Sequence, residues 1–226
     1  MTEKEILSTF EEVGAIITNS HLVYTSGKHG NAYINKDAVY PYTEKISMLC
    51  EEIAERFKDD NPDAVVAPAL GGIILSQWTA YHLTKKLGRE VYGVYAEKTD
   101  DGEFVIKRGY DDLIKGKKVL LVEDVLTTGG SIKKVVDVVR GIGSDIVGVA
   151  ALCNRGGITA QDIGGVPKFD ALLSITLDSW EEADCPLCTQ GVPINTKVGK
   201  GRKLGSGTNS LRKLSQTPFQ VEMNFH

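Results

Sequence analysis

Two adjacent carboxylates stand close to a hydroxyl-rich glycine turn in this chain. The segment from Glu123 to Ser131 has the sequence EDVLTTGGS. A turn of Gly, Thr and Ser before a helix offers free backbone N–H groups, hydroxyl donors and the positive end of the helix dipole, which suit a phosphate. Neighbouring carboxylates accept hydrogen bonds from two hydroxyls at once and suit a diol or a metal-bound sugar. The segment therefore predicts a site for a phosphorylated sugar.

The alternative interpretation is a plain strand-turn-helix connection with solvated acids. Two acids at the end of a buried strand are costly without a ligand or a cation, which favours the binding site. The chain contains neither GxxxxGK[ST] nor GxGxxG. The loop is therefore neither that of a P-loop ATPase nor that of a dinucleotide-binding fold.

Alternating strands and helices are predicted around this loop. Apolar, β-branched runs predict five strands, at residues 63–67, 90–96, 117–122, 146–152 and 169–176. Apolar residues at helical spacing predict helices at residues 1–18, 42–58, 71–87 and 131–140. The pattern predicts an α/β fold with a mostly parallel central sheet flanked by helices, with ligands at the carboxyl ends of the strands.

Cations also stand at positions that could face such a ligand. Residues 97–115 are densely charged and lack periodicity, so we expect a functional or mobile loop that carries Lys98, Lys107 and Arg108. Arg155 follows the strand at 146–152 and precedes two glycines, so we expect it at the same sheet edge. The alternatives are a solvated charged loop and an arginine on a surface turn.

Composition narrows the class of protein. The 226 residues are 42% apolar and 25% charged, as in ordinary globular proteins. The longest apolar stretches are about eight residues, whereas a membrane span needs about 20, so no membrane partner is expected. The start of the chain lacks the basic and apolar segments of a signal peptide, and four cysteines are present, which favours the reducing cytoplasm. The net charge of −4 gives no reason to expect a nucleic-acid partner.

The positive charge gathers at the end of the chain. Residues 197–226 contain six Lys or Arg and one Glu, which gives +5, so residues 1–196 carry −9. This segment is rich in Gly, Ser, Thr and Asn and is predicted to be a flexible basic tail behind a domain of residues 1–196. A tail that binds phosphate or RNA is the alternative.

The segment EDVLTTGGS resembles the signature loop of type I phosphoribosyltransferases, which bind 5-phosphoribosyl-1-pyrophosphate (PRPP). The resemblance implies that Glu123 and Asp124 hold the 2- and 3-hydroxyls of the ribose. It also implies that the following turn cradles the 5-phosphate, with these residues in the PRPP site: Val125, Leu126, Thr127, Thr128, Gly129, Gly130 and Ser131.

Residues 1–201 are similar to the orotate phosphoribosyltransferases within that family. The similar segments are SGKHGNAYI (26–34), APALGG (67–72), AEK (96–98) with KRGY (107–110), NRGG (154–157), and CPLC (185–188) with GVP (191–193). The resemblance implies that orotate contacts Thr127, Arg155, Lys28, Tyr33 and Ile34. It implies that PRPP also contacts Leu70, Gly71 and Lys98, and that the catalytic residues are Lys98, Arg108 and Asp124.

The implied activity is the transfer of a phosphoribosyl group from PRPP to orotate, which gives orotidine 5′-monophosphate and pyrophosphate in pyrimidine biosynthesis. Mg²⁺ is the implied cofactor, bound through PRPP with Glu123 and Asp124 as candidate ligands. The implied assembly is a homodimer with shared active sites, in which Lys98 acts on the partner's substrate and residues 97–115 are disordered without ligand. A small hood is expected from parts of residues 1–35 and 160–185.

Two other functions remain open. A purine-base phosphoribosyltransferase would leave Arg155 without an evident partner, because its base is neutral. A non-catalytic regulator would keep the PRPP site and bind nucleic acid. Thr25 and Gly71 stand where family members often have lysine, so the sequence leaves open whether activity is reduced.

The cysteines give a weaker pattern. Cys185 and Cys188 form half of a zinc site, and no second pair of ligands or close histidine follows them. Cys50 and Cys153 are predicted core residues. A four-cysteine site shared across a dimer and a redox pair are the alternatives. His29, in the hood segment, is a candidate contact of the substrate.

Overall fold

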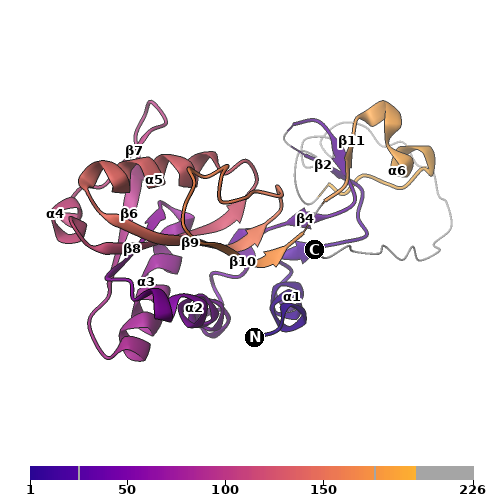
Figure 1. The fold of residues 1–226 in the computed structure, drawn as a ribbon. Helices are drawn as coiled ribbons and strands as arrows, with labels where there is room; N and C mark the ends of the chain where they lie inside the picture. Colours follow the sequence, from indigo (N-terminus) through magenta and orange to yellow (C-terminus); the bar gives the residue numbers. More distant parts are fainter. Residues whose placement is uncertain (25, 176, 197–226) are drawn as a thin grey trace.

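The computed structural model describes residues 1–24, 26–175 and 177–196. The predicted basic tail and the departure at Thr25 lie outside the described residues. The centre is a six-stranded sheet in the order β10-β9-β8-β5-β6-β7 (Figure 1). Its strands are β5 (Ala64–Pro68), β6 (Tyr92–Lys98), β7 (Phe104–Val105), β8 (Lys118–Leu126), β9 (Asp145–Asn154) and β10 (Phe169–Ser174).

Five of these strands are parallel and correspond to the five predicted strands, whereas β7 is antiparallel to β6. The central strands are nearly continuous apolar runs because both faces of the sheet are covered; all five residues of β5 are buried. The mostly parallel α/β fold is confirmed. β8 continues to Leu126, so the two acids lie inside the strand rather than after it.

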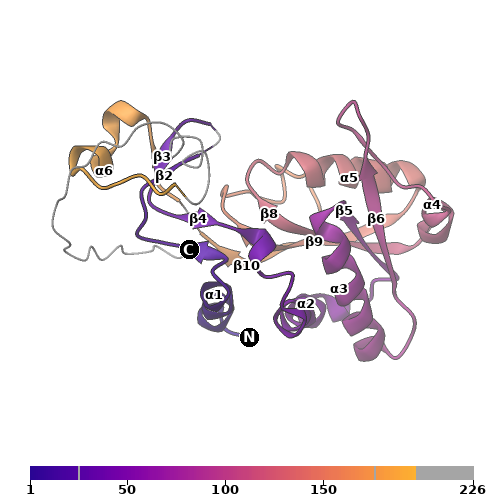
Figure 2. The ribbon, with the colours of Figure 1, turned by 180° about the vertical axis from the view of Figure 1, so that it is seen from behind.

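Helices cover both faces of the sheet (Figures 1 and 2). On one face lie α1 (Glu3–Glu12), α2 (Thr43–Phe57) and α3 (Gly71–Leu87), and the short helix η2 (Lys58–Asp60) follows α2. On the other face lie α5 (Gly130–Ile142) and the short α4 (Tyr110–Ile114). The apolar face of α5 contributes Ile132, Val135, Val136 and Val139 to the core. None of the helices in the described part of the chain could cross a membrane.

The helix predicted over residues 1–18 ends earlier than expected. Gly14 has a φ of +67°, a left-handed conformation that stops the helix after Glu12. Ile16 and Ile17 then form β1 (Ile16–Ile17), which pairs antiparallel with β4 (Tyr33–Ile34). The run of apolar residues at helical spacing is therefore divided between a helix and a strand.

Residues 97–115 have more regular structure than the sequence predicted. Glu97 pairs with Val105 and Lys98 with Phe104, so the segment begins as a β-hairpin, and it ends in α4. The segment expected to be a mobile loop thus contains a hairpin and a helix, because Phe104 and Ile106 are buried and anchor the hairpin to the core beneath α5.

A small subdomain, the hood, stands beside the sheet. Its three-stranded antiparallel sheet has the order β11-β3-β2, from β11 (Ser179–Trp180), β3 (His29–Gly30) and β2 (Leu22–Val23). The short helices η3 (Glu182–Asp184) and α6 (Pro186–Thr189) complete it. Residues 160–166, expected in the hood, instead pack beside α5 through Ile163 and Val166. The hood thus joins two segments distant in sequence (Figure 2).

Candidate active site

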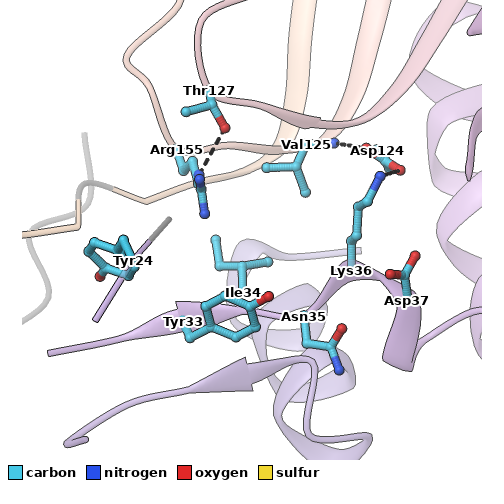
Figure 3. Close-up of a pocket in the computed structure, with 10 residues that line it drawn as sticks. All are labelled: Tyr24, Tyr33, Ile34, Asn35, Lys36, Asp37, Asp124, Val125, Thr127 and Arg155. Atoms are coloured by element: carbon cyan, nitrogen blue, oxygen red, sulfur yellow. Dashed lines mark hydrogen bonds and ion pairs between the residues drawn. The ribbon is translucent and has the colours of Figure 1, made fainter. Parts of the chain in front are cut away.

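Three adjoining hollows lie along the carboxyl ends of the parallel strands. The hood pocket, of about 340 Å³, is lined by Tyr24, Tyr33, Ile34, Asn35, Lys36, Asp37, Asp124, Val125, Thr127 and Arg155 (Figure 3). The acid pocket, of about 240 Å³, is lined by Lys36, Pro68, Ala69, Leu70, Gly71, Lys98, Phe104, Glu123, Asp124, Val125 and Ser131. The turn pocket, of about 180 Å³, is lined by Glu123 and Val125–Ile132. Val125 borders all three, so they form one cleft.

The acidic pair lies in the floor of this cleft. Asp124 is 3% exposed, and its Oδ2 accepts hydrogen bonds from Lys36 Nζ at 2.6 Å and from the Tyr40 hydroxyl at 3.1 Å. Glu123 is 7% exposed, and its Oε1 accepts a bond from the Asp124 amide at 3.1 Å. Burial, and secondly the charge of Asp124, raises the pKa of Glu123 to about 8. The pair therefore carries less than two negative charges at neutral pH until a cation or donor hydroxyls arrive.

Lys36 is the main residue that the sequence analysis missed. It begins the short helix η1 (Lys36–Ala38), two residues after Ile34, the buried end of β4. Burial opposes its charge, but the bond to Asp124 outweighs this and raises the pKa of Lys36. A charged residue just after a short apolar strand was the available signal, but nothing local connects it with an acid 88 residues away.

Gly71, a departure from the family pattern, is explained by the ion pair of Lys36 and Asp124. A Cβ atom on residue 71 would collide with Oδ2 of Asp124 and would stand 3.4 Å from Nζ of Lys36. Any larger side chain here would displace the Asp124 carboxylate. The ammonium group of Lys36 therefore lies beside the position that a side chain of residue 71 would occupy.

The start of α5 lines the turn pocket. Gly129 caps this helix with a φ of +71°, and a Cβ there would lie 2.8 Å from Ile163, so only glycine fits without strain. Gly129 has no side chain to cap the helix, and Thr128 Oγ1 accepts from the Gly130 amide at 3.4 Å, which leaves the other backbone N–H groups of the first turn for a ligand in the pocket. Thr128 and Ser131 add hydroxyls to the same lining. The turn can hold a phosphate in the way its sequence predicts.

Arg155 lies at the end of β9, across the cleft from the hood. Its amide and that of Gly156 donate to the Leu126 carbonyl at 3.0 and 3.2 Å, which joins the two loops. Its Nε donates to Thr127 Oγ1 at 2.9 Å. Figure 3 shows the guanidinium directed at Ile34, with Tyr33 and Tyr24 nearby. No carboxylate among the described residues pairs with Arg155, so its charge is available to an anion in the hood pocket.

The remaining predicted site residues divide into two groups. Lys98, Leu70 and Gly71 line the acid pocket. Arg108 donates to Glu97 at 2.7 Å, and Lys28 pairs with Glu181 at 3.2 Å; neither is among the residues that line the three pockets. The pairing of β6 with β7 and of β11 with β3 brings these two cations to acids on the outer surface.

Comparison with known proteins gives concordant results. Residues 41–177 match the model of the phosphoribosyl transferase domain. The chain is 38% identical over 193 residues to an orotate phosphoribosyltransferase of Pelotomaculum thermopropionicum, which covers 85% of this chain and 95% of the relative. It is 34% identical over 194 residues to that of Caldanaerobacter subterraneus subsp. tengcongensis, with 86% and 96% covered. The structure of orotate phosphoribosyltransferase from Aeropyrum pernix has a similar fold, with a TM-score of 0.61, 22% identity, and 75% and 93% covered.

Proposed function

Because the chain belongs to the orotate phosphoribosyltransferases of the phosphoribosyl transferase family, we propose that the continuous cleft binds the two substrates of this reaction end to end. The enzyme transfers the phosphoribosyl group of PRPP to orotate and releases pyrophosphate and orotidine 5′-monophosphate, a step of pyrimidine biosynthesis. The observation that carries the assignment of the cleft is the position of the buried acid pair between a phosphate turn and an unpaired arginine.

PRPP occupies the turn and acid pockets in this proposal. The 5-phosphate binds the backbone and hydroxyls of residues 127–131. The ribose hydroxyls donate to Glu123 and Asp124 in the floor between the two pockets. The pyrophosphate then lies over Leu70 and Gly71, within reach of Lys36 and Lys98.

Orotate occupies the hood pocket. Its carboxylate pairs with the Arg155 guanidinium, which presents a planar fork of donors matched to a carboxylate. Thr127, which accepts from Arg155 Nε, holds that fork in place. Tyr33 and Ile34 cover the ring from the hood side.

The negative charge that develops on the leaving group determines which residues the cleft needs. Pyrophosphate gains negative charge as it leaves the anomeric carbon, so cations fixed beside it stabilise the transition state. Lys36 and Lys98 are those cations, and Asp124 stabilises the positive charge that grows on the ribose. The hood and the β6–β7 hairpin border the cleft and limit the access of water, which would otherwise compete as nucleophile.

Mg²⁺ is part of the proposal. Carboxylate oxygens suit this ion, which also prefers substrate phosphates and keeps some of its waters. Asp124 Oδ2 already accepts from Lys36 and Tyr40, whereas Glu123 accepts from the backbone amide of Asp124, so Glu123 is the better placed of the two for the ion or its waters. When bound, Mg²⁺ neutralises charge on the leaving diphosphate.

A homodimer is the assembly we propose, and an exposed apolar face supports it. Leu70, Ile74 and Tyr81 lie along α3 and its N-cap and are 84%, 37% and 50% exposed, and Met48 on α2 is 39% exposed. Exposed apolar residues gathered on one surface mark interaction sites. Because Leu70 also lines the acid pocket, contact through this face would bring a partner to the cleft. Lys98, which was expected to act on the partner's substrate, lines the acid pocket of its own chain.

The activity is tested by incubating the protein with Mg²⁺, PRPP and orotate and following the loss of orotate absorbance. Adenine and hypoxanthine replace orotate in parallel reactions that separate base, nucleotide and pyrophosphate. Turnover of orotate alone is expected. Turnover of a purine, or PRPP binding without turnover of any base, would contradict the assignment. A cytoplasmic location belongs to the same proposal, in keeping with four cysteines that form no disulfide.

A further inference from the structure

Four potential metal ligands meet in the hood, away from the cleft. They are His21 just before β2, His29 in β3, and Cys185 and Cys188 at the start and within α6. Their ligand atoms all lie within 4.8 Å of one another. His21 is 2% exposed, His29 4% and Cys185 0%, while Cys188 is exposed. Polar groups so deeply buried need partners, and here the partners are one another.

The distances between these atoms are those of ligands around one small ion. Cys185 Sγ and Cys188 Sγ each lie 3.6 Å from His21 Nε2, and Cys188 Sγ lies 3.2 Å from His29 Nδ1. Tetrahedral zinc with bonds of about 2.3 Å to sulfur and about 2.05 Å to nitrogen sets the sulfur–nitrogen separation at about 3.6 Å. The His21 Nε2 to His29 Nδ1 distance of 2.8 Å needs an opening of about 0.5 Å to match the same geometry.

Hydrogen bonds alone cannot satisfy the four side chains of this cluster. The Val192 carbonyl lies 2.7 Å from Nδ1 of His21, and a carbonyl only accepts, so Nδ1 carries the proton. Nε2 of the neutral ring then has a single lone pair. Three groups, His29 Nδ1, Cys185 Sγ and Cys188 Sγ, converge on that lone pair. One cation bound to all four atoms uses each lone pair once.

We propose that His21, His29, Cys185 and Cys188 bind one Zn²⁺ ion. Two thiolates and two imidazoles are a ligand set typical of structural zinc, and binding releases the two thiol protons to solvent. The protein fills all four positions, so the ion has no open site for a substrate. The bond from His21 Nδ1 to Val192 fixes the tautomer, as carbonyl partners of zinc-bound histidines do. The second pair of ligands thus precedes the cysteines in the sequence, whereas the search for such a pair had looked at the residues after them.

The position of the ion gives it a structural role. Its ligands join residues 21–29 to residues 185–188, two parts of the hood that the pairing of β3 with β11 and a bridge from His21 to Ile194 also hold together. Tyr24 lies on the same hairpin as His29, passes close over Gly30 and faces the hood pocket. Zinc therefore fastens the hairpin that forms one wall of this pocket.

Metal analysis of the full chain tests the proposal. Protein purified without chelators and kept reduced should contain roughly one zinc per chain after gel filtration. Cys188→Ser and His29→Asn should weaken zinc binding at least about 100-fold, because even the loss of an outer partner costs about 10–100-fold. Cys50→Ser and His82→Asn are the matched controls, since these residues lie on α2 and α3, and both should keep the zinc.

Cobalt gives a second measurement that depends on no substitution. Wild-type protein stripped with a chelator and titrated with Co²⁺ should show the intense visible absorption of a tetrahedral ion and a thiolate charge-transfer band. Excess Zn²⁺ should abolish both. Absence of zinc together with absence of these bands would overturn the proposal. So would full zinc content in both ligand variants, or a Cys185–Cys188 disulfide that forms in air although the reduced protein was first supplied with zinc.

Discussion

Replacing Arg155 with alanine tests how the hood pocket recognises its base. The guanidinium donates to the side chain of Thr127 and pairs with no acid among the described residues, so its charge is free to meet the orotate carboxylate in the proposed complex. Removing one partner of a charge-assisted contact in a site closed to water costs about 2–4 kcal/mol. At about 1.4 kcal/mol per tenfold, Arg155→Ala should lower kcat/KM for orotate by roughly 30–1000-fold.

Arg155→Ala should hardly change the affinity for PRPP. In the proposed arrangement PRPP contacts residues 128–131 and the acid pair in the other two pockets, so the Kd for PRPP from calorimetry should stay within about threefold of the wild-type value. Arg155→Lys keeps the charge but loses the planar fork and the bond to Thr127, and should recover only part of the loss.

Lys28→Ala is the matched control. The family resemblance implies that Lys28 contacts orotate, whereas the structure pairs it with Glu181 on the outer surface of the hood. Steady-state kinetics with orotate should therefore show less than a threefold change for Lys28→Ala. A loss of PRPP affinity in Arg155→Ala with an unchanged KM for orotate would refute the assignment of the hood pocket to the base.

Three further substitutions test other parts of the cleft and its surroundings. Because the pKa of Glu123 is raised to about 8 in the folded protein, its contribution to stability is lost as pH rises from about 4.5 to about 8. Glu123→Gln should remove this loss. The free energies of unfolding in urea at about pH 5 and about pH 8.5 should therefore differ less in the variant than in the wild type. Lys36→Met removes a cation from the pyrophosphate subsite and should weaken PRPP binding by roughly tenfold or more in calorimetry; unchanged affinity would exclude the lysine from that subsite. Tyr81→Asp puts a charge on the exposed face of α3 and should shift sedimentation equilibrium towards monomers, whereas an active wild-type monomer would contradict the proposed dimer.

The parts of the molecule predicted well from sequence are those in which neighbouring residues decide the structure. Buried parallel strands are continuous apolar runs, so the five strands could be located directly, and α3 has the predicted bounds. The phosphate turn was also visible, because its glycines, hydroxyls and acids are contiguous. Even here β7 and the early end of α1 were missed, since tertiary contacts of Phe104 and Ile16 outweigh local pattern.

The parts predicted poorly depend on partners far away in the chain. Lys36 meets Asp124 across 88 residues, and His21 meets Cys185 across 164, so spacing gave no signal for either contact. Arg108 and Lys28 fit the family pattern by position, but the acids that neutralise them come from strand pairing. A charged side chain shows its type in sequence, whereas its partner is decided by the fold.

The division of the hood between two distant segments has a consequence for the order in which the protein assembles. A ribosome completes the β2–β3 hairpin and then the whole parallel sheet before it releases β11, so one edge of β3 stays unpaired through most of synthesis. Contacts of such long sequence separation form late, because closing the loop costs entropy before any contact repays it. The nascent chain therefore acquires the turn at residues 127–131 and the acid pair before the hood wall of the cleft is complete.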